Sequence, residues 1–356
     1  MRVVVAGGGT AGHIEPALNT ADALRELDRR IVVTALGTAK GLESRLVPAR
    51  GYELDLIPAV PLPRKFGVEL LSVPQRLRAT VAATRRILDE READVVVGFG
   101  GYVALPAYLA ARGRVPTVVH EANAKAGLAN RVGARFTDFV AETYPGSLRG
   151  AEMVGIPLRS SIANVDRAAT REYAREFFGL APDRQVIVVF GGSQGARRLN
   201  VAVSGAAPAL VAAGYSVLHA RGGKNTDQGS DPSLPQVVTT DYISRMDLAY
   251  AAADVAVCRA GALTVAELCA VGLPAIFVPL PIGNGEQQRN ALPVVSAGGG
   301  IMVPDAEFTA DRLVTEALGL LVEPTRLVRM SAASGALGDR GAAQRLAQMT
   351  IAAAGG

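Results

Sequence analysis

Two glycine-rich turns, each between an apolar run and a helical pattern, constrain the fold of this chain more than any other feature. The first follows residues 3–6 and reads Gly-Gly-Gly-Thr-Ala-Gly-His over 7–13. The second follows residues 186–190 and reads Gly-Gly-Ser-Gln-Gly-Ala over 191–196. Glycines let the backbone pass close to a ligand, and the N–H groups that open the next helix favour an anion. Two such turns predict two α/β domains of the nucleotide-binding type.

The first turn also matches the dinucleotide motif through Gly7, Gly9 and Gly12. A dinucleotide site requires an acidic residue about 20 residues further on, at the end of the second strand, to hold the ribose. The expected second strands, 31–36 and 215–220, are followed by Gly-Thr-Ala and Arg-Gly-Gly. Neither strand end carries a carboxylate, which argues against NAD or FAD.

Length and composition support two globular domains. The chain has 356 residues, with 49% hydrophobic and 20% charged residues, and a single core usually stops growing at about 250–300 residues. The formal net charge of +4 is compatible with an anionic ligand or membrane surface. No dense Lys/Arg cluster is interleaved with aromatic residues, so nucleic acid is not an expected partner.

The sequence gives no indication of a metal site, a disulfide or a membrane span. Cys258 and Cys269 are not flanked by His or Cys at metal-ligand spacing, so we expect reduced thiols. Strand-forming residues begin at Arg2, which leaves no room for a signal peptide. The longest uncharged apolar stretch, 268–283, contains three prolines, so any membrane contact should be peripheral.

Apolar runs predict alternating strands and helices in both halves of the chain. We expect strands at 3–6, 31–36, 94–99, 117–120 and 138–141, and again at 186–190, 216–219, 237–239, 255–258 and 275–278. This rhythm is typical of doubly wound parallel sheets, whose ligands bind at the carboxyl ends of the strands. A breaker at 155–158 predicts an interdomain hinge, giving domains over 1–157 and 158–339. The tail, 340–356, is helical in pattern.

Several polar residues should converge at the carboxyl ends of the first set of strands. They are His13, the loop 100–102 and the loop 121–123. An imidazole at the mouth of a cleft could take a proton from a hydroxyl group, although His13 could instead cap or pack at the helix start. We expect His120 and His219 to be structural.

Two segments of the second half allow both a structural and a functional interpretation. Thr264 and Glu267 have the spacing of a helix capping box, yet Glu267 could equally bind two ribose hydroxyls while the helix start holds a phosphate. Gln287 and Gln288 could be solvated loop residues, or they could bind the hydroxyl and N-acetyl groups of a sugar.

Residues 63–74 suggest a membrane-binding segment. Phe66, Val68, Leu70, Leu71 and Val73 lie beside Arg64, Lys65, Arg76 and Arg78. Apolar insertion could act there together with attraction to anionic lipid. In the helix that follows, Leu77, Val81, Thr84 and Leu88 have the spacing of a core-facing stripe.

As a set, the motifs resemble the MurG family of N-acetylglucosaminyltransferases. The resemblance lies in segments 7–13, 98–102, 120–123, 191–196, 258–264 and 287–291, and it extends from Arg2 to the tail. It implies a GT-B fold, with two Rossmann-like α/β domains facing each other across a cleft and the tail helix packed back on the first. It also implies inverting transfer of GlcNAc from UDP-GlcNAc to the MurNAc 4-hydroxyl of undecaprenyl-linked lipid I, forming lipid II for peptidoglycan.

The resemblance further assigns roles to individual residues. The residues implied in donor binding are Thr10, Gly12, Arg159, Ser193, Gly195, Ile243, Ala262, Leu263, Thr264, Glu267, Gln287 and Gln288. The acceptor side would comprise Tyr102, Asn123 and Asn130, with Asn130 behind the others. His13 is the expected catalytic base, and Glu121 or a water held by Asn123 is the alternative.

The same resemblance implies a peripheral enzyme at the cytoplasmic face of the plasma membrane, with no cofactor and with other cell-wall synthesis proteins as candidate partners. No Asp-x-Asp pair lies in a suitable loop, so loop amides, a helix start and Arg159 would stabilise the leaving diphosphate. Three other functions stay open: a diacylglycerol glycosyltransferase, a UDP-GlcNAc 2-epimerase, and a non-catalytic scaffold that binds a sugar nucleotide.

Overall fold

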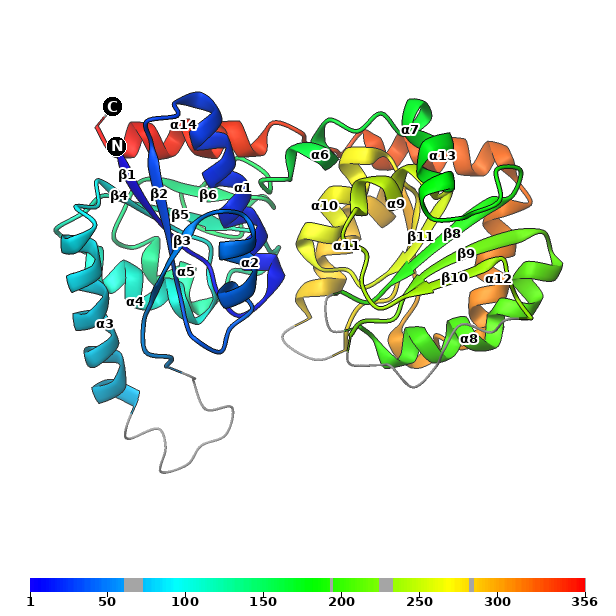
Figure 1. The fold of residues 1–356 in the computed structure, drawn as a ribbon, viewed down its shortest axis with the longest axis horizontal. Coiled ribbons are helices and arrows are strands. Elements are labelled where there is room, and N and C mark those ends of the chain that lie inside the picture. Colours follow the sequence, from blue (N-terminus) through cyan, green and yellow to red (C-terminus); the bar gives the residue numbers. More distant parts are fainter. Residues whose placement is uncertain (61–72, 193–194, 224–232, 282–284, 356) are drawn as a thin grey trace. The chain divides into compact units, whose positions relative to one another are not determined.

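The chain divides into two compact units. In the computed structural model, unit 1 comprises Met1–Arg159 and Arg340–Gly356, and unit 2 comprises Ser160–Asp339 (Figure 1). The structure describes residues 1–60, 73–192, 195–223, 233–281 and 285–355. The chain therefore passes between the units twice, once in each direction.

Unit 1 is built on a seven-stranded sheet in which every strand pair is parallel, in the order β3-β2-β1-β4-β5-β6-β7. The strands are β1 Arg2–Ala6, β2 Val32–Gly37, β3 Glu53–Leu56, β4 Val95–Gly98, β5 Thr117–Glu121, β6 Val140–Glu142 and β7 Glu152–Met153. The central strands are apolar on both faces because helices cover both sides of a parallel sheet.

The helices of unit 1 are α1 Ala11–Leu27, α2 Glu43–Ala49, α3 Val73–Glu90, α4 Gly101–Ala111, α5 Leu128–Gly133 and α14 Ala342–Ala353. Side chains of β1 alternate between two cores, as expected for a strand. Val3 and Val5 pack with α1 and α14, whereas Val4 and Ala6 pack with α3 and α4. The C-terminal helix α14 thus completes the core of unit 1, beside α1 (Figure 1).

Unit 2 is built on a six-stranded parallel sheet in the order β10-β9-β8-β11-β12-β13. Its strands are β8 Gln185–Phe190, β9 Tyr215–Ala220, β10 Val237–Thr240, β11 Val255–Cys258, β12 Ala275–Phe277 and β13 Gly300–Met302. Its helices are α6 Ser160–Ala163, α7 Arg167–Phe177, α8 Arg197–Ala212, α9 Met246–Ala252, α10 Ala262–Val271, α11 Glu286–Ser296, α12 Ala310–Leu321 and α13 Pro324–Gly335, with a short 3-10 turn at Asp305–Glu307.

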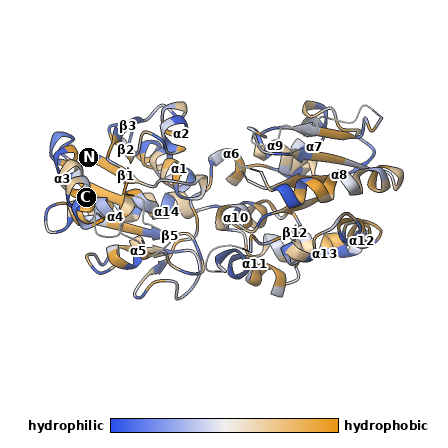
Figure 2. Cartoon of the chain, turned by 90° about the horizontal axis from the view of Figure 1, so that it is seen from below, coloured by the Kyte–Doolittle hydropathy of each residue, from blue (hydrophilic) through white to orange (hydrophobic). Residues whose placement is uncertain are grey.

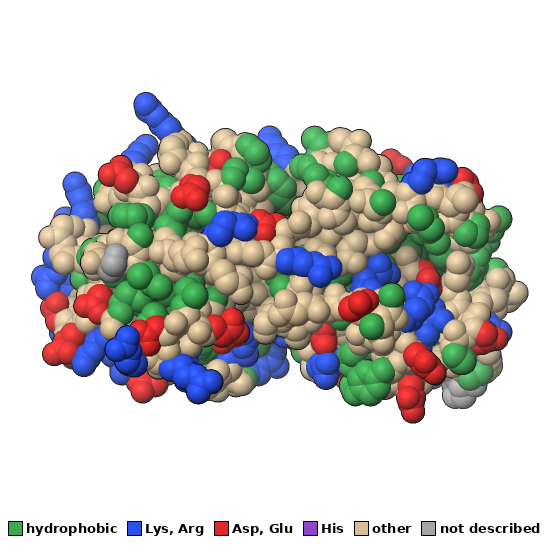
Figure 3. Space-filling view, turned by 90° about the horizontal axis from the view of Figure 1, so that it is seen from above, with side chains coloured by type: hydrophobic (Ala, Val, Ile, Leu, Met, Phe, Trp, Pro, Cys, Tyr) green, Lys and Arg blue, Asp and Glu red, His purple; other side chains and the backbone are tan. Residues whose placement is uncertain are grey.

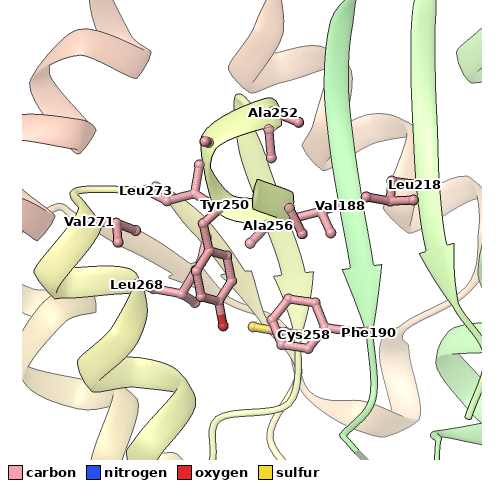
Figure 4. Close-up of a cluster of buried hydrophobic side chains, with 14 of the residues drawn as sticks. Val188, Phe190, Leu218, Tyr250, Ala252, Ala256, Cys258, Leu268, Val271 and Leu273 are labelled. Carbon is pink, nitrogen blue, oxygen red and sulfur yellow. The ribbon is translucent and has the colours of Figure 1, made fainter. Parts of the chain in front are cut away.

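Tyr250 is the central side chain of one of the two cores of unit 2. It comes from α9 and lies among Leu268 of α10 and Phe190 and Cys258 of the sheet (Figure 4). Figure 2 shows the same arrangement at the level of the elements, with hydrophobic strands inside and hydrophilic helix surfaces outside. The core of unit 2 therefore fixes α9 and α10 against the carboxyl half of the sheet.

The two parallel sheets confirm the expected α/β fold with doubly wound sheets. Each of the ten expected strands is present, with ends that differ by at most two residues, and three further strands are added: β3, β7 and β13. All three lie at the edge of a sheet and have only four, two and three residues, respectively. Their short length leaves little periodic signal in the sequence.

The segment 155–158, expected to be a hinge, is held on unit 1. Three side chains of unit 1 donate hydrogen bonds to backbone carbonyls there: His120 to Gly155 (2.7 Å), Asn19 to Pro157 (2.9 Å) and Arg345 to Val154 (2.8 Å). Unit 1 consequently extends to Arg159, two residues beyond the expected boundary.

The surface carries both signs of charge. On the face shown in Figure 3, Lys and Arg side chains are interspersed with Asp and Glu, in keeping with the small net charge of +4. None of the helices in the described ranges is long and apolar enough to cross a membrane.

Candidate functional site

His13 lies in the first turn of α1, directly after the glycine-rich loop of unit 1. Its Nδ1 is 3.1 Å from the Thr10 hydroxyl. Its ring packs against the turn that opens α4, where a Cβ added at Gly100 would approach the ring to 3.2 Å. Gly7 is also required, because its Cβ would lie 2.4 Å from the His13 carbonyl oxygen. The structure thus brings the loops at 7–13 and 100–102 together.

The surroundings of His13 favour a neutral imidazole. Burial lowers the pKa of His13 below its ordinary value, and the nearby Glu121 carboxylate opposes this shift only in part. A neutral imidazole at pH 7 can accept a proton from a hydroxyl group.

Glu121, at the end of β5, is 2% exposed. One of its oxygens accepts hydrogen bonds from the backbone N–H (2.9 Å) and the side-chain amide (3.2 Å) of Asn123. The other accepts from the Gly127 N–H (3.0 Å) and the Asn130 amide (2.9 Å). These four hydrogen bonds hold the Glu121 carboxylate in place and connect it to the loop that follows β5.

Asn130 is 1% exposed and lies behind Glu121. Its amide nitrogen also donates to the His120 carbonyl (2.9 Å), and its oxygen accepts from the Tyr108 hydroxyl (2.7 Å). Asn130 is thus enclosed among protein groups and helps to hold Glu121 in position.

Tyr102, in the first turn of α4, leads to a residue that the sequence reasoning missed. Its hydroxyl donates to Glu43 (2.9 Å) and lies 3.1 Å from the Thr38 hydroxyl. Glu43 is fully buried at the start of α2, six residues after β2. Residues 37–39, directly after the expected second strand, include no carboxylate. Glu43 is the first acidic residue after this strand, and its place at the start of the next helix is the signal that could have identified it.

In unit 2, the loop after β11 leads into α10. The N-cap of α10 is Gly261, so Ala262, Leu263 and Thr264 form its first turn and their N–H groups precede the first intrahelical bonds. The capping-box interpretation is wrong, because Thr264 lies inside the helix and no side chain caps it. Glu267 instead accepts a hydrogen bond from the Tyr250 hydroxyl (2.7 Å).

The start of α11 holds the peptide that precedes Gly261. The Gln287 side-chain oxygen accepts from the Ala260 N–H (3.1 Å) and the Leu280 N–H (2.9 Å), and the Asn290 amide lies 3.4 Å from the Ala260 oxygen. The Gln287 oxygen is therefore bound to backbone, which leaves its NH₂ group as the side for a ligand. Gln288 is exposed on the same turn.

The other expected donor residues lie in different surroundings. Ser193 falls outside the described residues, and Gly195, with φ +74°, belongs to the loop before α8. Ile243 is 4% exposed with its side chain in the core of unit 2, so only its backbone is available. Arg159 donates from Nε to Glu15 of α1 (3.0 Å) and also forms an ion pair with it.

In the described part of the chain, no group of three or more His, Cys, Asp or Glu side chains is placed to hold a metal ion. Cys258 and Cys269 are buried thiols, and burial raises the pKa of Cys269 to about 11. Neither thiol is therefore ionised at neutral pH.

Comparisons with known proteins agree with this geometry. The glycosyltransferase family 28 N-terminal domain matches residues 3–142, and the C-terminal domain of the same family matches residues 186–346. Two relatives, from Mycolicibacterium smegmatis and Saccharopolyspora erythraea, are 59% and 61% identical. The alignments cover 98% and 99% of this chain and 93% and 94% of those proteins. Both are named UDP-N-acetylglucosamine--N-acetylmuramyl-(pentapeptide) pyrophosphoryl-undecaprenol N-acetylglucosamine transferase.

Solved structures give the same result. MurG of Acinetobacter baumannii has a TM-score of 0.78 at 27% identity, with 99% of both chains covered. UDP-GlcNAc 2-epimerase from Neisseria meningitidis has a TM-score of 0.68 at 13% identity, a likeness of fold alone. With both domain models matched and full-length relatives of one name, this chain belongs to glycosyltransferase family 28 and to its MurG group.

Proposed function

We propose that this chain transfers GlcNAc from UDP-GlcNAc to the 4-hydroxyl of the MurNAc sugar in undecaprenyl-linked lipid I, with inversion, to give lipid II. The proposal rests on the 59% and 61% sequence identity, over nearly the full length, to relatives whose names specify this donor and acceptor. The loops of both units supply groups suited to each half of the reaction.

The donor would bind to unit 2. The N–H groups of the first turn of α10, together with Ser193 and Gly195, would hold the diphosphate, because a helix start favours negative charge. Glu267, oriented by the Tyr250 hydroxyl, would accept hydrogen bonds from both ribose hydroxyls. The Ile243 backbone would contact uracil, and Gln288 and the NH₂ group of Gln287 would contact the sugar.

The acceptor would bind to unit 1. The MurNAc hydroxyl attacks the anomeric carbon of GlcNAc while the bond from that carbon to the diphosphate oxygen breaks. His13 takes the hydroxyl proton at its ring nitrogen, and UDP leaves with the bonding electron pair. Asn123 and Tyr102 would line the acceptor side, with Glu121 and Asn130 as positioning residues behind them. Thr10 and Gly12 flank His13, where they would meet the donor sugar.

Arg159 would contribute positive charge near the nucleotide. Its Nε and one Nη are bound to Glu15 in this structure, which fixes the position of the guanidinium on α1. Stabilisation of the leaving diphosphate by N–H groups and a cation is electrostatic catalysis of the usual kind.

We also propose peripheral contact with anionic lipid at the cytoplasmic face of the membrane. Arg76, Arg78, Arg85 and Arg86 are exposed on α3, and their charge would attract an anionic surface. Most of the apolar segment that precedes α3, at 61–72, lies outside the described residues. Contact with other cell-wall synthesis proteins stays a prediction.

A transfer assay tests the proposed reaction. The protein is incubated with labelled UDP-GlcNAc and either lipid I, diacylglycerol or no acceptor. We expect label in a lipid-linked disaccharide with lipid I only. Label in diacylglycerol would indicate a different acceptor, conversion of UDP-GlcNAc without lipid would indicate an epimerase, and binding without turnover would indicate a scaffold.

A further inference from the structure

The glycine-rich loop of unit 1 already contains an anion, which is the carboxylate of Glu43. This side chain is 0% exposed. One oxygen accepts a hydrogen bond from the Gly9 N–H (3.2 Å). The other accepts from the Thr38 N–H and hydroxyl (both 3.0 Å) and from the Tyr102 hydroxyl (2.9 Å). The donors come from the loops after β1 and β2 and from the start of α4.

Glycines make room for this carboxylate. A Cβ at Gly41 would lie 2.1 Å from the carboxylate atoms, and one at Gly37 would lie 2.4 Å from Cγ of Glu43. A Cβ at Gly8 would approach the Glu43 oxygen to 3.3 Å. Backbone from two separate segments is therefore shaped around the Glu43 side chain.

The carboxylate is held in its charged form. Burial acts to raise the pKa of Glu43, but hydrogen bonds from the backbone N–H groups of Glu43, Thr38 and Gly9 outweigh it, so the pKa lies below its usual value. In a nucleotide-binding loop, a donor such as the Gly9 N–H faces a phosphate. Here the protein supplies the negative charge itself.

The same carboxylate connects two groups of the candidate acceptor site. Through Tyr102 it holds the start of α4, whose Gly100–Gly101 turn packs on the His13 ring. Through Gly9 it holds the loop that continues into Thr10 and His13. Gly9 in turn allows the Tyr102 ring to approach, since a Cβ there would lie 2.8 Å from the ring.

We propose that Glu43 is a positioning residue: its carboxylate is an internal anion in a seat formed by the donors of Gly9, Thr38 and Tyr102, and it fixes Tyr102 and His13 for catalysis. The expected effect of Glu43 on kcat rests on the proposed function, whereas the binding of its carboxylate in this seat does not.

Replacement of the carboxylate by an added anion tests the occupied seat directly. Glu43→Ala leaves the N–H and O–H donors without an acceptor, and formate is small enough to replace the lost group. We expect sodium formate to raise the melting temperature of Glu43→Ala, relative to sodium chloride, and to leave that of the wild type unchanged. An equal change in melting temperature of both proteins on addition of formate would overturn the proposal that the Glu43 carboxylate occupies this seat. This readout does not depend on any enzymatic activity.

The positioning role is tested by kinetics, with Glu142→Ala as the matched control. Glu142 is also buried (4% exposed) and accepts hydrogen bonds from a loop: from the N–H of Gly146 (2.8 Å), the hydroxyl of Ser147 (2.9 Å) and the N–H of Leu148 (3.0 Å). None of these partners is Gly9, Tyr102 or His13. Any loss of kcat that both variants share therefore indicates general destabilisation of unit 1.

We expect Glu43→Ala to lower kcat about 10-fold to 100-fold, because small displacements of catalytic groups have effects of this order. Its KM for UDP-GlcNAc should stay within about threefold of the wild-type value. Formate should restore part of the kcat of Glu43→Ala and none of any loss in Glu142→Ala. Glu43→Gln, which keeps the volume but offers the Gly9 N–H an NH₂ group, should be slow and insensitive to formate.

A kcat of Glu43→Ala within about threefold of that of Glu142→Ala, both measured below their melting temperatures, would overturn the positioning role. If Glu43→Ala does not fold, Glu43→Gln supplies the same comparison. Absence of lipid-linked product from the wild type would instead count against the proposed function, and the formate melting experiment would still decide whether the seat is occupied.

Discussion

Among single residues, His13 has the largest expected effect on turnover, because it is the proposed base. We expect His13→Ala to lower kcat by about 10²–10⁴, the usual range for loss of a general base, with UDP affinity nearly unchanged. Steady-state kinetics and calorimetric titration with UDP measure the two quantities. If the kcat of His13→Ala stays within about threefold of wild type, His13 is not the base and Glu121 is the expected alternative.

The pH profile adds a second criterion for His13. A base acts only when deprotonated, and the pKa of His13 is lowered from its ordinary value of 6.5. The kcat of the wild type should therefore hold as the pH falls to 6.5 and decline only below it. His13→Ala should lose this acid limb together with most of its activity.

Glu267 is the residue on which donor recognition depends. Glu267→Ala should weaken UDP binding, because each charge-assisted hydrogen bond to a ribose hydroxyl contributes about 1.5–3 kcal/mol. Tyr250→Phe removes only the hydroxyl that orients Glu267 and should weaken UDP binding less. Calorimetric titration of both variants with UDP checks the order, and unchanged affinity in Glu267→Ala would refute the ribose contact.

The expected parallel strands predicted that the loops at 7–13 and 100–102 meet, because the carboxyl ends of parallel strands share one edge of a sheet, and the close approaches of Gly7, Gly100 and Gly101 to His13 agree. The sequence did not reveal what Glu43 binds, because its partners Gly9, Thr38 and Tyr102 belong to three segments that only the sheet order brings together. The capping box failed for a local reason, since Gly261 starts α10 earlier than Thr264 requires.

At the scale of elements, Arg167 of α7 joins two helix ends in unit 2. Its guanidinium donates to four backbone carbonyls at the ends of α9 and α10: Tyr250 (3.0 Å), Ala253 (2.7 Å), Val271 (3.4 Å) and Gly272 (2.9 Å). Burial lowers the pKa of Arg167 to about 10, so it is still charged at neutral pH. These carbonyls would otherwise have no intrahelical donor.

We expect Arg167→Met to lower the free energy of unfolding of unit 2 by about 3 kcal/mol, because buried carbonyls lose charged donors. Arg329→Met is the control, since Arg329 forms an exposed ion pair with Glu323, of a kind worth about 0–1 kcal/mol. Scanning calorimetry compares the two variants. Equal melting temperatures would mean that Arg167 has no special role at these helix ends.

Apolar runs predicted ten of the thirteen strands in the described part of the chain, because both faces of a parallel sheet must be buried. Of the three added strands, β3 alternates charged and apolar residues, both residues of β7 are exposed, and β13 is apolar but only three residues long. Their pairing depends on the neighbouring strand in space, which sequence periodicity does not reveal.

At the scale of the whole molecule, the sequence predicted two units, because its length exceeds that of one core and the glycine turn occurs twice. It predicted a hinge at 155–158, whereas hydrogen bonds from Asn19, His120 and Arg345, which are far apart in the chain, hold this part of the chain on unit 1. The passage to unit 2 therefore occurs between Arg159 and Ser160.

Membrane association is a property of the whole molecule that can be measured on vesicles. Leu70→Ser with Leu71→Ser should reduce binding to anionic vesicles by removing apolar insertion, and Arg76→Glu with Arg78→Glu should reduce it by reversing charge. UDP affinity should be unchanged in both double variants. Vesicle sedimentation measures the binding, and unchanged binding of both double variants would defeat this proposal.

The linkage in the product tests most directly whether this chain transfers GlcNAc to the MurNAc 4-hydroxyl of lipid I with inversion. The protein is incubated with UDP-GlcNAc and lipid I, and the lipid product is examined by mass spectrometry and proton NMR. We predict one added GlcNAc, joined through a β linkage to the MurNAc 4-hydroxyl, because attack by that hydroxyl inverts the α configuration of the donor. An α linkage, a different attachment site, or release of a free sugar with lipid I unchanged would contradict the account.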